Sequence, residues 1–171
     1  VRGLAHARAL DILDDEGLRP SAIAGTSMGA IVGALYASGL SGRDILDLVE
    51  QRVIMPGDGL REIVRKKDAL FKWLSALRPS WEGGLLKADG VLSLLLDEIP
   101  TRTFEELSIP LRVVATDFRR GEAVVFERGE LIPALTASMA IPGIFAPVEH
   151  EGRLLVDGGL VDNLPYDALP D

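Results

Sequence analysis

The chain has 171 residues, of which 47% are hydrophobic and 26% are charged. This is the length of one domain with a substantial core, and the apolar content excludes a mainly disordered chain. The absence of cysteine excludes disulfides and thiolate chemistry, and the net charge of −8 argues against general binding of nucleic acid. The two histidines, His6 and His150, are too few for a histidine-rich metal centre.

The first half of the chain is predicted to be mainly helical. In the first expected helix, Gly3–Glu16, Leu4 and Leu10 recur at helical spacing, and Gly17 follows its end. Ser41 is placed to cap the N-terminus of the third expected helix, Asp44–Arg52. Because the segment Ser27–Ser38 is apolar on nearly every side, we expect it to be buried. The expected helices are Gly3–Glu16, Ser27–Ser38, Asp44–Arg52, Leu60–Leu77 and Asp89–Glu98, with a short buried strand at Ser21–Gly25.

The second half is predicted to be richer in strands. Two β-rich runs, Leu111–Thr116 and Glu122–Phe126, flank a turn and predict a hairpin. A helix at Leu131–Ser138 and a short strand at Arg153–Val156 follow. Because helices and short apolar strands alternate, the sequence predicts an α/β fold, a three-layer α/β/α sandwich with a central, mainly parallel sheet. Residues 1–171 would form a single domain.

A candidate nucleophile lies in Gly25-Thr26-Ser27-Met28-Gly29, a G-x-S-x-G pattern between a predicted strand and a predicted helix. Such a turn exposes a serine hydroxyl at the end of the sheet, and the flanking glycines allow the chain to fold back tightly. The helix that follows directs free N–H groups and its positive dipole end toward the site, where they can stabilise an oxyanion. The alternative is that Ser27 only caps the helix in a tight structural turn.

A serine nucleophile needs a proton acceptor, and the sequence offers two candidates. Asp157 follows the apolar strand Leu154–Val156, and the glycine pair after it allows another backbone segment to approach closely. An aspartate can act as the base where it contacts the serine directly and loses solvent, whereas the structural alternative is a simple Asx turn. His150 is the only histidine after Ser27, and its polar surroundings predict an exposed turn between two strands.

Four blocks, in this order, resemble the patatin-like phospholipase family, and the similarity covers nearly the whole chain. Arg2–His6 is similar to the end of a glycine-rich oxyanion loop, and Gly25–Ala30 to a nucleophile elbow. The other two blocks are Ala137–Phe145, similar to a segment that precedes the catalytic aspartate, and Val156–Leu160 followed by Asn163–Pro165, similar to the D-G-G/A motif.

The resemblance implies a patatin-like fold and the hydrolysis of lipid acyl esters through an acyl-enzyme, with no metal or cofactor. The resemblance implies a dyad without histidine, in which Ser27 attacks the ester carbonyl and Asp157 accepts the proton of the Ser27 hydroxyl. The other motif positions of the site are Arg2, Gly3, Gly25, Met28, Gly29, Gly158 and Gly159. Because only Arg2 and Gly3 of the oxyanion loop are present, we expect a domain truncated at the N-terminus, without that loop and its first strand, and also at the C-terminus.

Two other functions stay open on the sequence. A serine acyltransferase would need a histidine poised on Ser27, and His150 is the candidate. A catalytically silent binding module is the other alternative, because the oxyanion loop is incomplete.

Contact with a membrane surface is predicted for Leu60–Arg78, which carries six basic and two acidic residues with Phe71, Trp73 and Trp81 in it or just after it. An amphipathic helix of this kind can lie on an anionic lipid surface, whereas the alternative is a helix packed on the core with a solvated basic face. No stretch has the roughly 18 uncharged apolar residues of a membrane span. With no secretory signal visible, we expect a cytoplasmic or peripheral membrane location.

Overall fold

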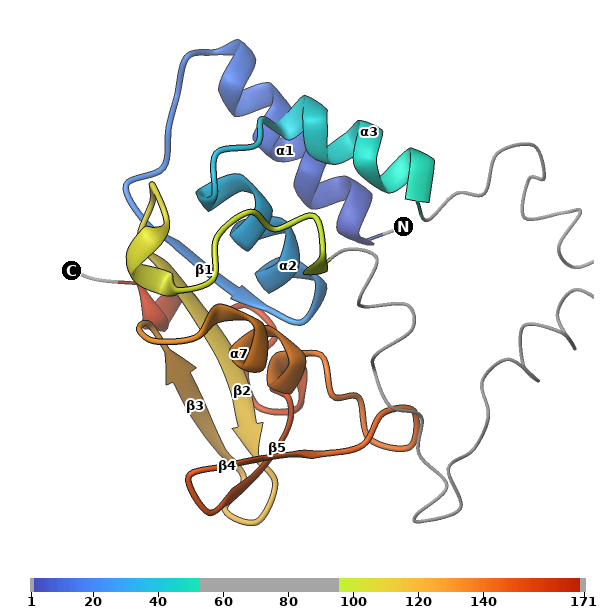
Figure 1. Cartoon of the computed structure of the whole chain (residues 1–171), viewed down its shortest axis with the longest axis vertical. Helices are drawn as coiled ribbons and strands as arrows, with labels where there is room; N and C mark the ends of the chain where they lie inside the picture. The colour runs from blue at the N-terminus through green and yellow to red at the C-terminus, as the bar shows by residue number, and fades with distance from the viewer. Residues whose placement is uncertain (1, 53–95, 170–171) are drawn as a thin grey trace, which may run out of the picture.

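The structure, a computed structural model, describes residues 2–52 and 96–169 (Figure 1). The segment Leu60–Arg78 and nearly all of Asp89–Glu98, both predicted to be helical, lie outside the described residues. No helix in the described ranges is long and apolar enough to cross a bilayer. The helices are α1 (Arg2–Asp15), α2 (Met28–Ala37), α3 (Gly42–Arg52) and α7 (Leu131–Ser138), and the strands are β1 (Ile23–Thr26), β2 (Leu111–Asp117), β3 (Glu122–Phe126), β4 (Val148–His150) and β5 (Arg153–Asp157), with short 3-10 turns at Phe104–Glu106, Gly158–Leu160 and Tyr166–Ala168.

The described residues form a sheet of five strands, in which β2 has three strand partners. β2 pairs parallel with β1 and antiparallel with β3 and β5, and β4 pairs antiparallel with β5. The prediction of a mainly parallel sheet is therefore wrong for the described strands. Part of the reason is local, because tight turns at Gly121 (φ 68°) and at Glu151–Gly152 (φ 48° and 74°) join β2 to β3 and β4 to β5, and short turns connect only antiparallel neighbours. The antiparallel pairing of β2 with β5 instead joins segments far apart in the chain.

Two strands share one edge of β2. β1 pairs with residues 111–114 of β2 and β5 with residues 115–117, while β3 pairs with residues 113–117 and so overlaps both. Because a strand has only two edges, β1 and β5 must lie on the same edge, opposite β3. Thr26 and Asp157, the last residues of β1 and β5, pair with successive residues of β2. The carboxyl ends of β1 and β5 therefore meet head to head.

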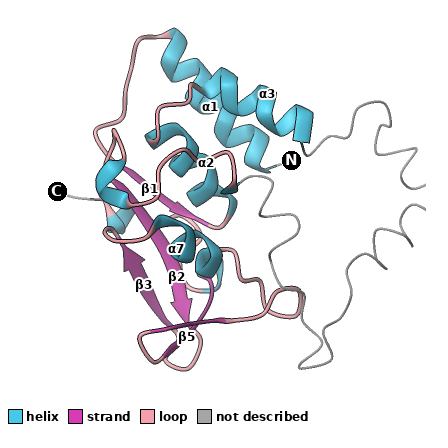
Figure 2. Cartoon of the chain, in the orientation of Figure 1, coloured by secondary structure: helices cyan, strands magenta, loops and turns pink. Residues whose placement is uncertain are grey.

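Helices α2 and α7 cover one face of the sheet, and α1 and α3 pack against α2 (Figures 1 and 2). Leu111 and Val113 of β2 share one hydrophobic core with buried residues of α2 and α7, because alternate residues of a strand point to the same face. All residues of α2 from Ala30 to Ala37 are buried, which confirms the expectation from its apolar sequence.

The opposite face of the described sheet carries the C-terminal segment, residues 158–169. The hydroxyl of Thr26 donates to the carbonyl of Asp162 at 2.8 Å, and the guanidinium of Arg112 donates to the carbonyl of Ala168. The alternation of helices and strands confirms the α/β class. A second helical layer on this face, as the three-layer sandwich requires, stays a prediction.

The start of α3 follows the predicted cap. The N–H of Asp44 donates to the hydroxyl of Ser41 at 3.1 Å, and the carboxylate of Asp44 accepts the N–H and hydroxyl of Ser41 at 3.0 and 2.6 Å. These hydrogen bonds stabilise the charged form, so the pKa of Asp44 is below its ordinary value.

Candidate active site

Ser27 lies in a strained turn between β1 and α2. Its φ of 54° and ψ of −126° fall in a region that residues with a side chain rarely adopt, at a cost of about 1–3 kcal/mol. The carbonyl of Ser27 accepts the N–H of Ala30 at 2.9 Å, so the chain enters α2 directly after the turn. The first N–H groups of α2, including that of Met28, are free to face a ligand because a helix leaves them without internal partners.

Gly25 allows this turn because α2 folds back onto the end of β1. A Cβ atom at Gly25 would lie 2.7 Å from the backbone nitrogen of Ala30 and 2.8 Å from its Cα. These are backbone contacts that cannot be relieved by a change of rotamer. Gly29, by contrast, has space on its side-chain face, where the nearest atom to a Cβ would be Nε2 of His6 at 3.9 Å.

Asp157 ends β5 and is 8% exposed. Its carboxylate accepts the N–H of Gly159 at 2.7 Å, and its backbone N–H donates to the carbonyl of Ala140 at 2.9 Å. A Cβ at Gly158 would lie 2.2 Å from the carbonyl oxygen of Val114. The glycine therefore lets the end of β5 lie directly against β2, beside the end of β1.

The strand pairing brings Ser27 and Asp157 to the same point of the sheet. In the described part of the chain no hydrogen bond joins their side chains. The hydroxyl of Ser27 instead donates to Sδ of Met139 at 3.3 Å. Sulfur is a weak acceptor, so this contact holds the hydroxyl only weakly.

The C-terminal end of α7 forms one wall of the site, which the sequence analysis did not predict. The hydroxyl of Ser138 accepts the N–H of Ser27 at 2.8 Å, and Met139 follows it. Both residues belong to the block Ala137–Phe145 that resembles the segment preceding a catalytic aspartate. Their place in that block was the signal that could have identified them.

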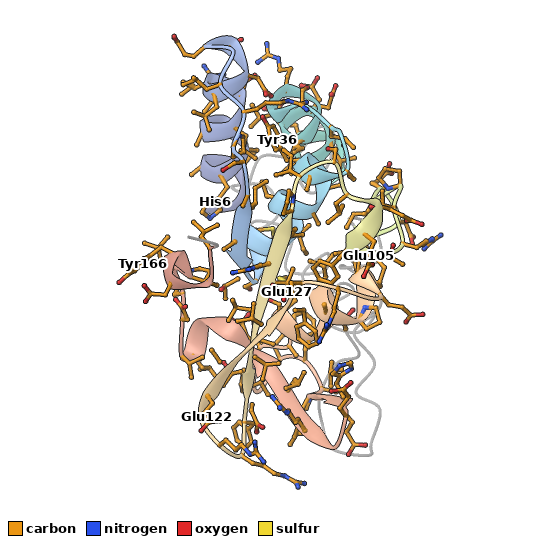
Figure 3. The ribbon with its side chains drawn as sticks, turned by 90° about the vertical axis from the view of Figure 1, so that its left-hand side faces the viewer. His6, Tyr36, Glu105, Glu122, Glu127 and Tyr166 are labelled. Atoms are coloured by element: carbon orange, nitrogen blue, oxygen red, sulfur yellow. The ribbon has the colours of Figure 1, made fainter. Side chains whose placement is uncertain are left out.

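A cavity of about 670 Å³ lies beside Ser27, along the edge of β1 that faces away from β2. Its wall comes from α1, β1, the first turns of α2 and the segment Asn163–Pro165. Apart from Thr26, Ser27, Asn163 and one ionisable residue, His6, the described lining is apolar or glycine. His6 projects from the part of α1 nearest the sheet (Figure 3). Asp157 is not in this lining.

His150 lies elsewhere in the molecule. It is the last residue of β4, half-buried, with its ring edge-on to Phe126 at 5.2 Å between ring centroids. The prediction of an exposed turn is therefore wrong at this residue, since the turn begins at Glu151. His150 lines a separate cavity of about 560 Å³ that Ser27 does not reach.

The roles of the remaining predicted positions stay predictions. Arg2 and Gly3 form the first turn of α1, and Gly158 and Gly159 begin the 3-10 turn that follows Asp157. Within the described ranges, no group of three or more His, Asp or Glu side chains is arranged to hold a metal ion.

A family model described as patatin-like phospholipase matches residues 1–170. The chain belongs to the patatin-like phospholipase family. This confirms the resemblance recognised in the four sequence blocks and the patatin-like α/β fold that they imply. VipD from Legionella pneumophila has a similar fold, with a TM-score of 0.58 over 98% of this chain and 46% of VipD at 18% identity.

Curated relatives of this patatin-like chain include an uncharacterized NTE family protein of Mycobacterium tuberculosis, 38% identical over 168 residues. A patatin-like phospholipase domain-containing protein of Caenorhabditis elegans is 32% identical over 171 residues. The alignments cover 96% and 99% of this chain, but only 41% and 12% of the relatives. The chain thus spans less than half the length of these two relatives.

Proposed function

We propose that this chain hydrolyses acyl esters of phospholipids or related lipids, with Ser27 as the nucleophile and Asp157 as the base. The observation that carries the proposal is the meeting of the strained Ser27 turn with the carboxyl end of β5 on one edge of β2. Membership of the patatin-like phospholipase family supports lipid esters as the substrate class. The largely apolar cavity beside Ser27 has the chemistry that an acyl chain requires.

The proposed reaction has two halves. Oγ of Ser27 attacks the ester carbonyl carbon while its proton moves to the carboxylate of Asp157. The resulting oxyanion accepts hydrogen bonds from N–H groups at the start of α2 and from those of Arg2 and Gly3 in the first turn of α1. The C–O bond then breaks, and the departing alcohol takes the proton from Asp157. Water, activated by Asp157, hydrolyses the acyl-enzyme and releases the fatty acid.

The test is a hydrolysis assay with p-nitrophenyl butyrate, combined with covalent labelling by a fluorophosphonate probe. We expect Ser27→Ala to remove labelling and to lower hydrolysis by at least about a thousandfold, because the covalent step is lost. Ser21→Ala, at an exposed serine near the start of β1, is the matched control and should react like the wild type. Equal hydrolysis by Ser27→Ala and wild type would exclude Ser27 as the nucleophile, and a wild type that neither hydrolyses nor labels would support the silent binding module.

The acyltransferase alternative depends on a histidine at Ser27. His150 lines a different cavity and packs against Phe126, so no observation favours that alternative. We therefore do not propose it.

We also propose that the protein is cytoplasmic or attached peripherally to a membrane, with Leu60–Arg78 as the contact. The basic and aromatic composition of this segment supports the proposal. In sedimentation with vesicles, we expect binding to 30% phosphatidylglycerol in phosphatidylcholine and loss of that binding in Lys66→Glu/Lys67→Glu. Equal binding of the variant would assign the contact to another surface.

A further inference from the structure

The hydroxyl of Ser138 joins the end of helix α7 to two neighbouring parts of the sheet. Ser138 is the last residue of α7 and is fully buried. Its Oγ accepts the N–H of Ser27 at 2.8 Å and donates to the carbonyl of Val114 at 2.6 Å. One hydroxyl therefore connects the nucleophile turn to the central strand.

The geometry of the turn explains why a hydroxyl is needed there. β1 pairs with β2 as far as Thr26, opposite Val114, and the chain then turns away at Ser27. The turn takes the N–H of Ser27 out of the β-ladder, so this donor and the carbonyl of Val114 must both find other partners in a buried site. A hydroxyl can accept from the first and donate to the second at the same time.

Another hydroxyl of α7, that of Thr136, bonds within the helix, so a helical position alone does not explain the contacts of the Ser138 hydroxyl. Thr136, two residues earlier, donates its hydroxyl to the carbonyl of Ile132 at 2.9 Å, which is the usual bond back to the preceding turn. The hydroxyl of Ser138 leaves the helix instead and bonds to two other elements. The next residue, Met139, accepts the hydroxyl of Ser27, so the end of α7 contacts both the backbone and the side chain of the proposed nucleophile.

We propose that Ser138 is a positioning residue, whose hydroxyl replaces a missing ladder hydrogen bond and holds Ser27 in its strained conformation. A residue with positive φ persists only where its surroundings fix it, and Ser138 provides the fixed contact on the sheet side. The inference rests on the proposed function for its effect on the reaction. Its structural part is independent of that function.

The test compares Ser138→Ala with Thr136→Val, which removes a hydroxyl from the same helix without touching Ser27. Measurements are made well below the unfolding midpoint of each variant. We expect Ser138→Ala to lower kcat for p-nitrophenyl butyrate and the rate of Ser27 phosphonylation by about 10- to 100-fold, because small displacements of a reacting group are costly, with KM changed by less than about twofold. Thr136→Val should keep the wild-type values, and Ser138→Thr, which retains the hydroxyl, should recover most of the loss.

Amide hydrogen exchange of the segment 24–30 provides a readout that needs no activity. We expect Ser138→Ala to speed exchange at Ser27 by roughly tenfold, since its N–H loses its acceptor, and Thr136→Val to leave it unchanged. Unchanged exchange, equal losses in the two variants, or a loss confined to KM would each overturn the inference. Faster exchange in a protein that never hydrolyses esters would support the positioning contact and reject the proposed function.

Discussion

The Ser27 cavity and the His150 cavity are similar in volume, about 670 and 560 Å³, but they differ in what lines them. One ionisable residue, His6, borders the first. The second is bordered by His150 and five charged residues, namely Glu127, Arg128, Glu130, Glu151 and Arg153. The charged cavity holds the histidine that sequence order allowed as a base, yet the proposed nucleophile lies at the apolar one. Titratable groups alone therefore do not locate the candidate site in this molecule.

Backbone strain distinguishes the two regions more sharply. Two described residues other than glycine have positive φ, Ser27 at 54° and Glu151 at 48°. Glu151 is exposed at the tip of the β4–β5 hairpin, where such angles are ordinary for a two-residue turn. Ser27 is held by the buried hydroxyl of Ser138 at the end of α7, which is itself hydrogen-bonded to Val114 of β2. The strain at Ser27 supports its proposed role because the surrounding structure holds the residue in that conformation, not because of the angle itself.

Replacing Asp157 and His150 by uncharged amides gives the largest expected difference between the two regions. Asp157→Asn should lower kcat for ester hydrolysis by about 10²- to 10⁴-fold, because the amide cannot take the proton of Ser27. His150→Gln should stay within roughly twofold of the wild type, since His150 lines a cavity that does not include Ser27. Steady-state kinetics with p-nitrophenyl butyrate measure kcat for both variants. A greater loss of kcat in His150→Gln than in Asp157→Asn would contradict the assignment of Asp157 as the base.

A methyl group added beside the Ser27 site should lower the free energy of unfolding more than one added at the β2–β3 turn. Gly158→Ala should lower the free energy of unfolding by about 3 kcal/mol, because the new Cβ would meet the Val114 carbonyl oxygen at 2.2 Å and Thr26 at 2.9 Å. Gly121→Ala, at the β2–β3 turn, meets no atom within 4 Å and carries only the cost of its φ of 68°, roughly 1 kcal/mol. Urea unfolding measures both, and equal losses would mean that the strand ends are less tightly apposed than described.

Helix α2, which follows Ser27, should make the free energy of unfolding depend on pH in the alkaline range through Tyr36. Burial, together with the hydrogen bond to the Asp14 carboxylate at 2.5 Å, raises the pKa of Tyr36 above its usual value near 10. The pKa of Tyr36 is raised only in the folded state, so the protonated tyrosine stabilises the folded protein. This contribution is complete below about pH 10 and is lost as the pH rises through the pKa of Tyr36 in the folded state.

Tyr36→Phe should therefore lower the free energy of unfolding by about 1–2 kcal/mol at pH 8 and flatten its decline above pH 10. Tyr166→Phe, at an exposed tyrosine of the C-terminal segment, is the control and should change neither (Figure 3). Urea unfolding between pH 8 and pH 11 provides the measurement. An identical pH slope in Tyr36→Phe and wild type would contradict the assignment.

The smallest effect is expected from the aromatic contact beside His150. Phe126→Leu removes the edge-on ring and should cost about 1 kcal/mol of folding stability while leaving ester hydrolysis unchanged. Thermal unfolding and the same ester assay check the two parts. A fall in hydrolysis with this variant would show that the two regions are coupled.

Local patterns predicted the elements of this fold well. The bounds of Glu122–Phe126 and Leu131–Ser138 agree with the structure, because periodicity and turn residues within a few positions determine them. The pairing of the strands was not predictable in this way. That β5 runs antiparallel and shares an edge of β2 with β1 depends on contacts between residues far apart in the chain. A strand of three residues such as Val148–His150 has too short an apolar run to be recognised.

The same limit applies to the site. Ser27 and Asp157 could be named from motifs, since glycine flanks and strand ends are local features. The double hydrogen bond of Ser138 could not be foreseen, because a serine at the end of an apolar helix has several local partners and its actual ones come from β1 and β2.

The head-to-head meeting of β1 and β5 also determines when the site exists during synthesis and folding. The contact from Thr26 to Asp162 joins residues 136 positions apart, so the residues of the Ser27 turn are synthesised long before the strand β5 leaves the ribosome. Closing so long a loop costs entropy and comes late in folding. Nascent chains, and molecules that release β5, would therefore carry an exposed serine without its proposed base, and acyl hydrolysis would be confined to the completed domain.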